Sequence, residues 1–398
     1  MDKISIIPDD IIRFEILTRL PVKILMQFQC VCKSWQFLIS RDPIFIKAHV
    51  ARSVMDPSND RVIIRCHPTL RHKHISEDNI FNFPLFVCSK VGPVNEFDYP
   101  LLSSGMVLAG SVNGLVCLYS YNDKSKSIPC IGIWNPATHR YKDVRPPLNA
   151  YNIKAGDFSF AFVFDSIKKD YKVIYIIKTR NKNKANKPGQ VVADVYSCNA
   201  RSWAHINVSS SFELENGELF KYAITVGNRV YWNYSMAYGR KHDVISFDIG
   251  HEVFRLFHAP DLLPNQKMAT GNLNNLLVCL VHEYCWDKTT SVDVYALNET
   301  NGETWNKMYT VGPISLTRRM HIVQCFRNGD LFFSDYKEYR CLRFDPKTHA
   351  LLRSNSHAFD VDCLAVAYGI GYTQTLVSVM GMKHIEKNDC ERLLFIQS

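Results

Sequence analysis

Several features that mark familiar classes of protein are missing from this chain of 398 residues. The first ten residues, MDKISIIPDD, contain no apolar run of the ~7 to 15 residues that a secretory signal requires. No later stretch approaches the ~18 uninterrupted apolar residues of a membrane-spanning helix. Charged residues make up only 21% of the chain and hydrophobic residues 46%, which excludes a disordered tail. We expect a soluble protein with a large core, in the cytoplasm and/or nucleus, with no membrane partner.

Motifs of common enzymes and metal sites are missing as well. There is no G-x-S-x-G, no Walker loop and no H-E-x-x-H, and the G-x-G at 369–371 lacks the third glycine of a dinucleotide site. Cys30 and Cys32 are spaced C-x-C rather than the C-x-x-C of structural zinc sites. A group of three histidines has no carboxylate or cysteine placed to complete a site: His67, His72 and His74. We therefore expect no catalytic residue, no metal and no cofactor.

The basic charge is concentrated in one segment. The formal net charge is +9, and KTRNKNKANKPGQ, which begins at Lys178, contains five basic residues and no acidic residue or aromatic side chain. Surfaces that bind nucleic acid usually spread over a face and interleave aromatic residues for stacking. The segment is therefore interpreted as a solvated hairpin loop, and a nucleic-acid partner is not expected. The 13 cysteines, an odd number, fit small buried side chains in a reducing compartment.

The first fifty residues show the pattern of short helices separated by turns. Pro8, followed by two aspartates, predicts a helix start, and that helix should end at Leu20 because the next residue is proline. Pro21 suits the first position of a second helix, to about Gln29. A third helix should begin near Ser34, and Asp42-Pro43 predicts a fourth.

These helices carry more apolar surface than a small domain can bury. Isoleucine and leucine cover more than one stripe of the first helix, and Ile24, Leu25, Met26 and Phe28 do the same on the second. A unit of about 45 residues cannot make a core large enough to hide all of it. A partner protein that accepts an apolar helix face is one explanation. Packing of the helices on the rest of the same chain is the alternative.

The segment IPDDIIRFEILTRLPVKILMQFQCVCKSWQFLISRDPIFIKAH resembles the F-box motif of plant F-box proteins. The resemblance covers about residues 5 to 50 and includes Glu15-Ile16-Leu17, Arg19-Leu20-Pro21-Val22-Lys23 and Cys30-Val31-Cys32-Lys33-Ser34-Trp35. It implies docking on the Skp-type adaptor of a cullin-based ubiquitin ligase. Carried over position by position, the implied adaptor contacts are Pro8, Ile12, Ile16, Leu17, Leu20, Pro21, Leu25, Phe28, Val31 and Trp35.

Beyond residue 60 the apolar pattern changes from helical to alternating. Short runs such as RVIIRC, GLVCLY, YKVIYII and DLFFS are β-branched or aromatic and are bounded by Gly, Asn or Asp, which predicts many short strands. An aromatic residue recurs before a turn, at intervals of 62, 51, 48, 49 and 51 residues: Trp134, Tyr196, Phe247, Tyr295, Phe344 and Phe395. A repeat of about 50 residues with four strands is the signature of a kelch-like β-propeller blade.

The repeat also predicts how such a propeller would close. Strands at 61–67 and 71–78 have no complete repeat of their own, and strands expected at 363–369, 375–380 and 392–397 follow the fifth aromatic residue. We therefore expect six blades, closed by strands from both ends of the chain, with seven as the alternative. The aromatic repeat residues are interpreted as core. Candidates for exposed recognition residues flank one loop: Trp232, Tyr234 and Tyr238.

Residues 100 to 350, with NGLVCL and IWNPAT, resemble the F-box-associated region of plant F-box proteins. The combined resemblance implies a small all-α F-box at 1–50, a linker at 51–60 and an all-β propeller at 61–398 that binds the target. The implied function is a non-catalytic substrate-recognition subunit of a Skp–cullin–F-box ubiquitin ligase, which delivers a target protein for ubiquitination and proteasomal degradation. Alternatives are a ligase-independent propeller interaction module and a pollen self-incompatibility receptor of the same family.

Overall fold

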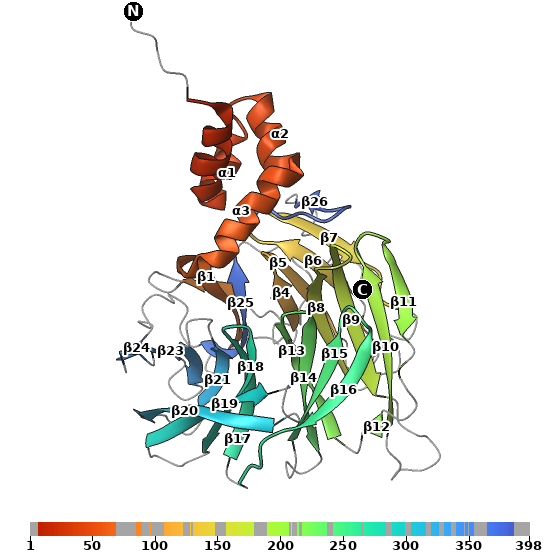
Figure 1. Ribbon diagram of the computed structural model, residues 1–398, viewed down its shortest axis with the longest axis vertical. Coiled ribbons are helices and arrows are strands. Elements are labelled where there is room, and N and C mark those ends of the chain that lie inside the picture. The colour runs from red at the N-terminus through yellow and green to blue at the C-terminus, as the bar shows by residue number, and fades with distance from the viewer. Residues whose placement is uncertain are drawn as a thin grey trace, which may run out of the picture.

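The computed structural model shows a helical head at one end of a group of β-sheets (Figure 1). No helix among the residues it describes is both long and apolar enough to span a membrane. The described residues are 7–68, 85–89, 95–96, 107–121, 128, 130–147, 157–178, 189–206, 208, 213–214, 217–236, 242–263, 266–283, 289–298, 304–315, 320–325, 330–335, 340–345, 347–348, 350–353 and 364–385.

The head, residues 7–55, contains the helices that the sequence predicts. The first consists of a π-helical segment, η1 (Ile11–Ile16), and a 3-10 turn, η2 (Leu17–Arg19). They are followed by α1 (Val22–Phe28), α2 (Lys33–Arg41) and α3 (Pro43–Met55). Pro21 is the residue before α1 rather than its first residue. Helix α3 continues into the segment expected as a linker, and η3 (Pro57–Asn59) separates it from the first strand.

The strands of the body form antiparallel sheets, and each sheet is built almost entirely from consecutive segments. The first sheet contains β1 (Asp60–Pro68), β2 (Leu85–Ser89), β3 (Asn95–Glu96) and β25 (Leu364–Thr373). The second contains β4 (Val107–Val112), β5 (Leu115–Tyr119), β6 (Ile131–Asn135), β7 (Arg140–Val144) and β26 (Lys383–His384). The third contains β8 (Phe158–Asp165), β9 (Asp170–Lys178), β10 (Gly189–Ser197), β11 (Ser202–Ile206) and β12 (Glu213–Leu214).

Three further sheets have four strands each. The fourth contains β13 (Gly217–Val226), β14 (Arg229–Met236), β15 (His242–Asp248) and β16 (Val253–His258). The fifth contains β17 (Gln266–Leu273), β18 (Leu276–Glu283), β19 (Thr289–Asn298) and β20 (Thr304–Ser315). The sixth contains β21 (Met320–Cys325), β22 (Leu331–Asp335), β23 (Arg340–Asp345) and β24 (Ala350–Arg353).

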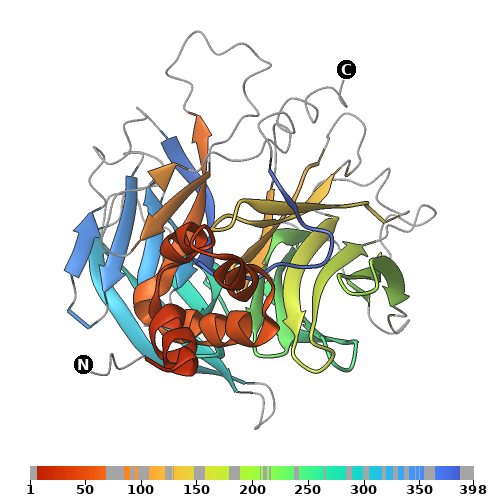
Figure 2. The same ribbon diagram turned by 90° about the horizontal axis from the view of Figure 1, so that it is seen from above.

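The sheets of the described residues close into a ring. One strand of each sheet contacts its counterpart in the next, in the cycle β25, β4, β8, β13, β17, β21 and back to β25. Strand β1 pairs antiparallel with β25, so the expected closure by strands from both ends of the chain is confirmed. Figure 2 shows the sheets around the head from above. The sequence favoured six blades over seven; the described strands form six sheets, and the blade number of the whole chain stays a prediction.

The strands predicted near the two ends of the chain are present only in part among the described residues. A strand expected at 375–380 is wrong: after β25 the chain is irregular until β26, which lies on the outer edge of the second sheet beside β7. Its alternating apolar residues instead pack against the head and against the blades. The strands expected at 71–78 and 392–397, with the repeat residue Phe395, lie outside the described residues.

The repeat residues occupy matching positions in the sheets, with one exception. Trp134, Tyr196 and Phe247 each lie opposite a second aromatic residue seven positions later, and Phe344 lies opposite Leu351. In the fifth sheet the residue at this position is Leu297, opposite Trp305, and Tyr295 is only half-buried. The choice of Tyr295 was wrong, because this hairpin is one residue longer and its ladder is irregular at 294–295.

The turns after Trp134 and Phe247 have a chemical cause that the sequence shows. The side-chain oxygen Oδ1 of Asn135 accepts hydrogen bonds from the backbone N–H groups of Ala137 and Thr138, and Asp248 does the same in the fourth sheet. Such Asx turns replace backbone pairing where the chain reverses. His139 and Glu252 then adopt the left-handed conformation, with φ of 51° and 57°.

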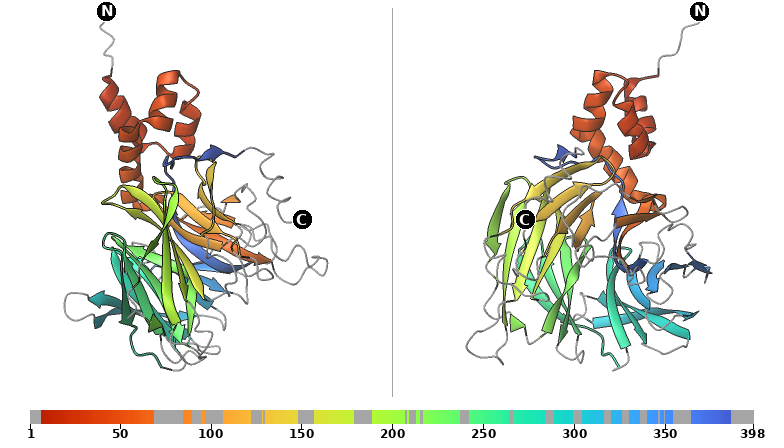
Figure 3. Two further views of the ribbon diagram at one scale, coloured as in Figure 1. Left: turned by 90° about the vertical axis from the view of Figure 1, so that its right-hand side faces the viewer. Right: turned by 180° about the vertical axis from the view of Figure 1, so that it is seen from behind.

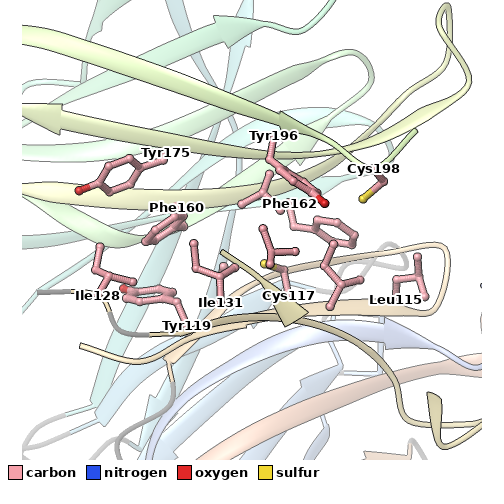
Figure 4. Close-up of a cluster of buried hydrophobic side chains, with 14 of the residues drawn as sticks. Leu115, Cys117, Tyr119, Ile128, Ile131, Phe160, Phe162, Tyr175, Tyr196 and Cys198 are labelled. Carbon is pink, nitrogen blue, oxygen red and sulfur yellow. The ribbon is translucent and has the colours of Figure 1, made fainter. Parts of the chain in front are cut away.

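The largest part of the core lies between the second and third sheets. Leu115, Cys117 and Tyr119 of β5 face Phe160, Phe162 and Tyr175 of the third sheet (Figure 4). The Phe160 and Tyr175 rings stack with their centroids 4.7 Å apart. Burial raises the pKa of the Cys198 thiol to about 12, so this cysteine is an inert core side chain, as the cysteine count suggested.

Candidate functional site

The helices of the head enclose a small apolar core of their own. Its buried side chains come from η2, α1, α2 and α3 and from one residue of the body: Leu17, Val22, Leu25, Leu38, Ile39, Phe45 and Leu376. The last of these follows β25, so the head is packed on the propeller side as well as on itself (Figure 3). Packing on the same chain, the alternative left open by the sequence, therefore accounts for part of the apolar surface.

Polar contacts cap helix α3 and connect it to η1. The Asp42 Oδ1 atom accepts hydrogen bonds from the backbone N–H groups of Ile44 and Phe45, and Pro43 occupies the first turn, as the sequence predicts for the fourth helix. The other oxygen of Asp42 lies 2.6 Å from Arg13 Nη2 of η1. Hydrogen bonds from Arg19 and Arg52 to Glu15 lower the pKa of that carboxyl group. These pairs bind η1 to α3.

A buried histidine of α3 contacts the backbone just before α1. The His49 side chain is 1% exposed, and its Nε2 atom lies 3.2 Å from the Leu20 carbonyl oxygen. Because a carbonyl oxygen only accepts hydrogen bonds, Nε2 carries the proton. Nδ1 can then accept a hydrogen bond from the Ser53 hydroxyl group, 3.4 Å away. Burial lowers the pKa of His49, with the bond to Leu20 acting in the opposite direction. The neutral ring is therefore the form that this site stabilises.

The ten predicted adaptor contacts fall into three groups. Four are exposed: Pro8, Ile16, Pro21 and Val31. Four are half-buried: Ile12, Leu20, Phe28 and Trp35. Leu17 and Leu25, at 1% and 0% exposure, belong to the head's own core and, unlike the other eight, present no surface for direct contact in this structure. Both side chains pack between the helices that carry the exposed residues.

The exposed residues lie in the segments of the head that project beyond the sheets (Figure 1). Val31 is 62% exposed, in the turn between α1 and α2, and Ile16 is 43% exposed, at the end of η1. Phe28 and Trp35 support that turn from either side, with ring centroids 5.4 Å apart. Exposed apolar side chains beside half-buried aromatic residues can bind a protein with an apolar groove.

Three further apolar residues, on or just before η1 and on α2, are exposed but were not predicted as contacts: Ile7, Ile11 and Phe37. A signal for Phe37 was present. The inward stripe of α2 contains Trp35, Leu38 and Ile39, and Phe37 does not share that stripe. The same reasoning could not select Ile7, which precedes the first helix and has no periodicity to test.

Cys30 and Cys32 are exposed free thiols in and just after the turn before α2. Hydrogen bonds from the Ser34 side chain and from the backbone of Trp35 lower the pKa of Cys32. Among the described residues, no group of three or more His, Cys, Asp and Glu side chains could hold a metal ion.

Two of the candidate recognition residues on the propeller are buried. Trp232 and Tyr234 are 0% and 1% exposed, so their selection as recognition residues is wrong, whereas Tyr238 lies outside the described residues. Tyr234 accepts a hydrogen bond from Lys178 Nζ at 2.8 Å. Lys178, the end of β9, is therefore buried and not part of a solvated loop; the remaining basic residues of its segment lie outside the described residues.

Comparison with known proteins agrees with this architecture. Residues 4–47 match the F-box domain, and residues 81–363 match the F-box associated beta propeller domain. The chain belongs to the family of F-box proteins with an F-box-associated propeller. An F-box/kelch-repeat protein of Arabidopsis thaliana is 26% identical over 330 residues, which cover 79% of this chain and 84% of the relative. A second F-box protein of that plant is 28% identical over 272 residues, 67% of this chain and 80% of the relative.

Among solved structures, a lectin of Aleuria aurantia bound to α-methyl-L-fucoside is similar at a TM-score of 0.43, with 9% identity, over 82% of this chain and 98% of the lectin.

Within the F-box match lie η1, α1, α2 and the start of α3, which carry the exposed apolar residues. The propeller match covers the third to sixth sheets completely and β4 to β7 of the second. The F-box protein thus has two separate surfaces, the projecting helices and the ring.

Proposed function

We propose that this chain is the substrate-recognition subunit of a Skp–cullin–F-box ubiquitin ligase. The F-box head binds a Skp-type adaptor, and through it a cullin, and the propeller holds a target protein for ubiquitination and proteasomal degradation. The observation that carries the proposal is the apolar surface of the head. Even after the head packs on itself and on Leu376, side chains such as Ile16 and Val31 remain exposed.

Transfer of ubiquitin in such a complex depends on proximity. A target held on the propeller has a high effective concentration beside a ubiquitin-charged enzyme bound to the cullin. The chain then needs no catalytic residue, no metal and no cofactor of its own. The proposed sites of action are the cytoplasm and/or the nucleus.

The experiment is co-purification of the full chain with a Skp-type adaptor. Ile16→Asp places a charge on an exposed side chain, so the head should stay folded, but binding would bury an unpaired carboxylate and should fail. Ile167→Asp is the matched control, since Ile167 is an exposed isoleucine of the propeller, 70% accessible. Undiminished co-purification of a folded Ile16→Asp chain would overturn the proposal, as would equal loss in the control.

A further inference from the structure

The irregular segment between β25 and β26, residues 374–382, lies between the head and the propeller. We call it the crossover segment. It passes over the ring end that faces the head, from the first sheet to the outer edge of the second (Figure 3). Three of its side chains are buried apolar residues although the segment pairs with no strand: Leu376, Val377 and Val379.

The buried side chains of the crossover segment serve two different cores. Leu376, 5% exposed, belongs to the core of the head. Val377 and Val379 belong to the core between the second and third sheets, where Ile46 and Val50 of helix α3 also pack. In an extended chain, successive side chains point to opposite sides. The alternating pattern that predicted a strand thus lets one segment bind the head on one side and the blades on the other.

Hydrogen bonds hold the crossover segment on the propeller. The Asn135 side-chain amide donates to the carbonyl oxygens of Thr375 and Val377, at 3.0 and 2.7 Å, and all of these groups are buried. Thr375 Oγ1 donates to the Asn113 carbonyl oxygen at 2.5 Å. Two turns of the second sheet therefore fix the backbone from which Leu376 projects.

Gly114 shows how closely this backbone is fitted. A Cβ atom at Gly114 would lie 2.2 Å from Thr375 Oγ1 and 2.8 Å from the Thr373 carbonyl oxygen. Only glycine leaves room for the crossover segment here, and the φ of 81° also favours glycine. By contrast, a Cβ at Gly227, in the turn between β13 and β14 of the fourth sheet with φ of 56°, would have its nearest neighbour at 3.9 Å.

We propose that the crossover segment, with Leu376 as its positioning residue, fixes the head in one orientation on the propeller. The consequence of this arrangement rests on the proposed function: the crossover segment would set the distance and direction from the adaptor to a bound target. Residues near the C-terminus would then control which lysines of a target, or of this chain, are modified, without touching the adaptor or the target.

Two substitutions should detach the head from the propeller. One acts where the crossover segment contacts the head, and the other acts where it contacts the propeller. Leu376→Asn removes the apolar contact with the head, and Gly114→Ala displaces the segment from the propeller without changing any residue of the head. Met380→Asn is the control for the first, because Met380 is on the same segment but 64% exposed. Gly227→Ala is the control for the second, because it also places an alanine at a positive φ but away from the segment.

The measurement is the rate of proteolysis of the full chain at residues 56–59, between α3 and β1. Both releasing variants should increase it at least about tenfold, because cleavage follows the population of the opened state, and their controls should not. In a reconstituted ligase, mass spectrometry should show that the same variants change which lysines of this chain are modified, while adaptor co-purification is retained. A change at lysines in segments that remain folded in the variants distinguishes a reoriented head from a weakened fold.

The proposal is overturned if Gly114→Ala leaves proteolysis at 56–59 equal to that of Gly227→Ala. It is also overturned if both releasing variants lose the adaptor, since the segment would then be part of the head's own fold. Failure of the proposed function gives a different result: the unmodified chain would not co-purify with the adaptor, whereas the proteolysis results would be unaffected.

Discussion

The two sides of the F-box head are similar in chemistry and different in their surroundings. On the side that faces the propeller, Leu376 completes the core and Ile46 and Val50 pack against the blades. On the projecting segments, Ile16 and Val31 are exposed. Apolar composition alone does not distinguish the sides. The difference is that the chain supplies a cover for one side, so the other is the surface on which a partner can bury apolar area.

The largest loss of stability is expected from Leu25→Asp, which tests the difference between the core of the head and its exposed surface. Leu25 is fully buried, so a carboxylate there should destabilise the head by about 4 kcal/mol or more. Ile16→Asp, at an exposed position, should change stability by no more than about 0.5 kcal/mol. Denaturant unfolding of both chains, followed by fluorescence and by hydrogen exchange of the head, measures the difference. Equal stability of the two variants would show that the head core is assigned wrongly.

A smaller loss of stability is expected from Asn135→Ala, on the side of the head that the propeller covers. The substitution leaves the buried carbonyl oxygens of Thr375 and Val377 without their donor and should cost about 3 kcal/mol. Asp345→Ala is the control, because Asp345 accepts from the Lys347 backbone in the corresponding turn of the sixth sheet. That loss should be about 1 kcal/mol. If the two denaturation midpoints shift equally, Asn135 acts only within its turn.

The head should also lose stability in mild acid. The folded-state pKa of His49 is lowered, so the unfolded chain binds the proton more strongly. The free energy of unfolding therefore falls as the pH decreases below the ordinary histidine pKa of 6.5, and levels off below the folded-state value. His49→Gln keeps a donor for the Leu20 carbonyl oxygen and should flatten this dependence. Urea unfolding of both chains from pH 7.5 to 5 is the test, and parallel pH profiles would contradict it.

The smallest effect is expected from the two exposed thiols. Cys30→Ala together with Cys32→Ala should change the unfolding free energy by no more than about 0.5 kcal/mol, because neither side chain is buried. Denaturant midpoints measured under reducing conditions provide the comparison. A loss of several times that size would mean that these cysteines have a structural role which their exposure does not show.

Much of this architecture was predictable because its signals are local. Asp42-Pro43 placed the start of α3, and the repeat residues with their turns placed the hairpins of the ring. The predictions that were wrong depend on contacts between distant segments. The alternation after β25 shows that side chains point both ways, but not that one side meets the head. Similarly, the F-box pattern does not show that Leu17 and Leu25 point inward, since this depends on α2, α3 and Leu376.

Errors in the propeller have the same origin. Tyr295 was chosen because it is aromatic, but the ladder register places Leu297 at the repeat position. Lys178 was grouped with its basic neighbours in sequence, whereas the hydrogen bond to Tyr234 comes from another sheet. Position within a sheet is decided by pairing, which residue type alone does not specify.

Hydrogen exchange of the full chain, with and without a saturating Skp-type adaptor, tests the central claim most directly. The account predicts that the adaptor slows exchange in η1, α1 and the turn that contains Val31, and leaves residues 374–382 unchanged because the propeller already covers that side. Slowed exchange confined to the propeller, or no slowing in the head at saturation, would contradict it.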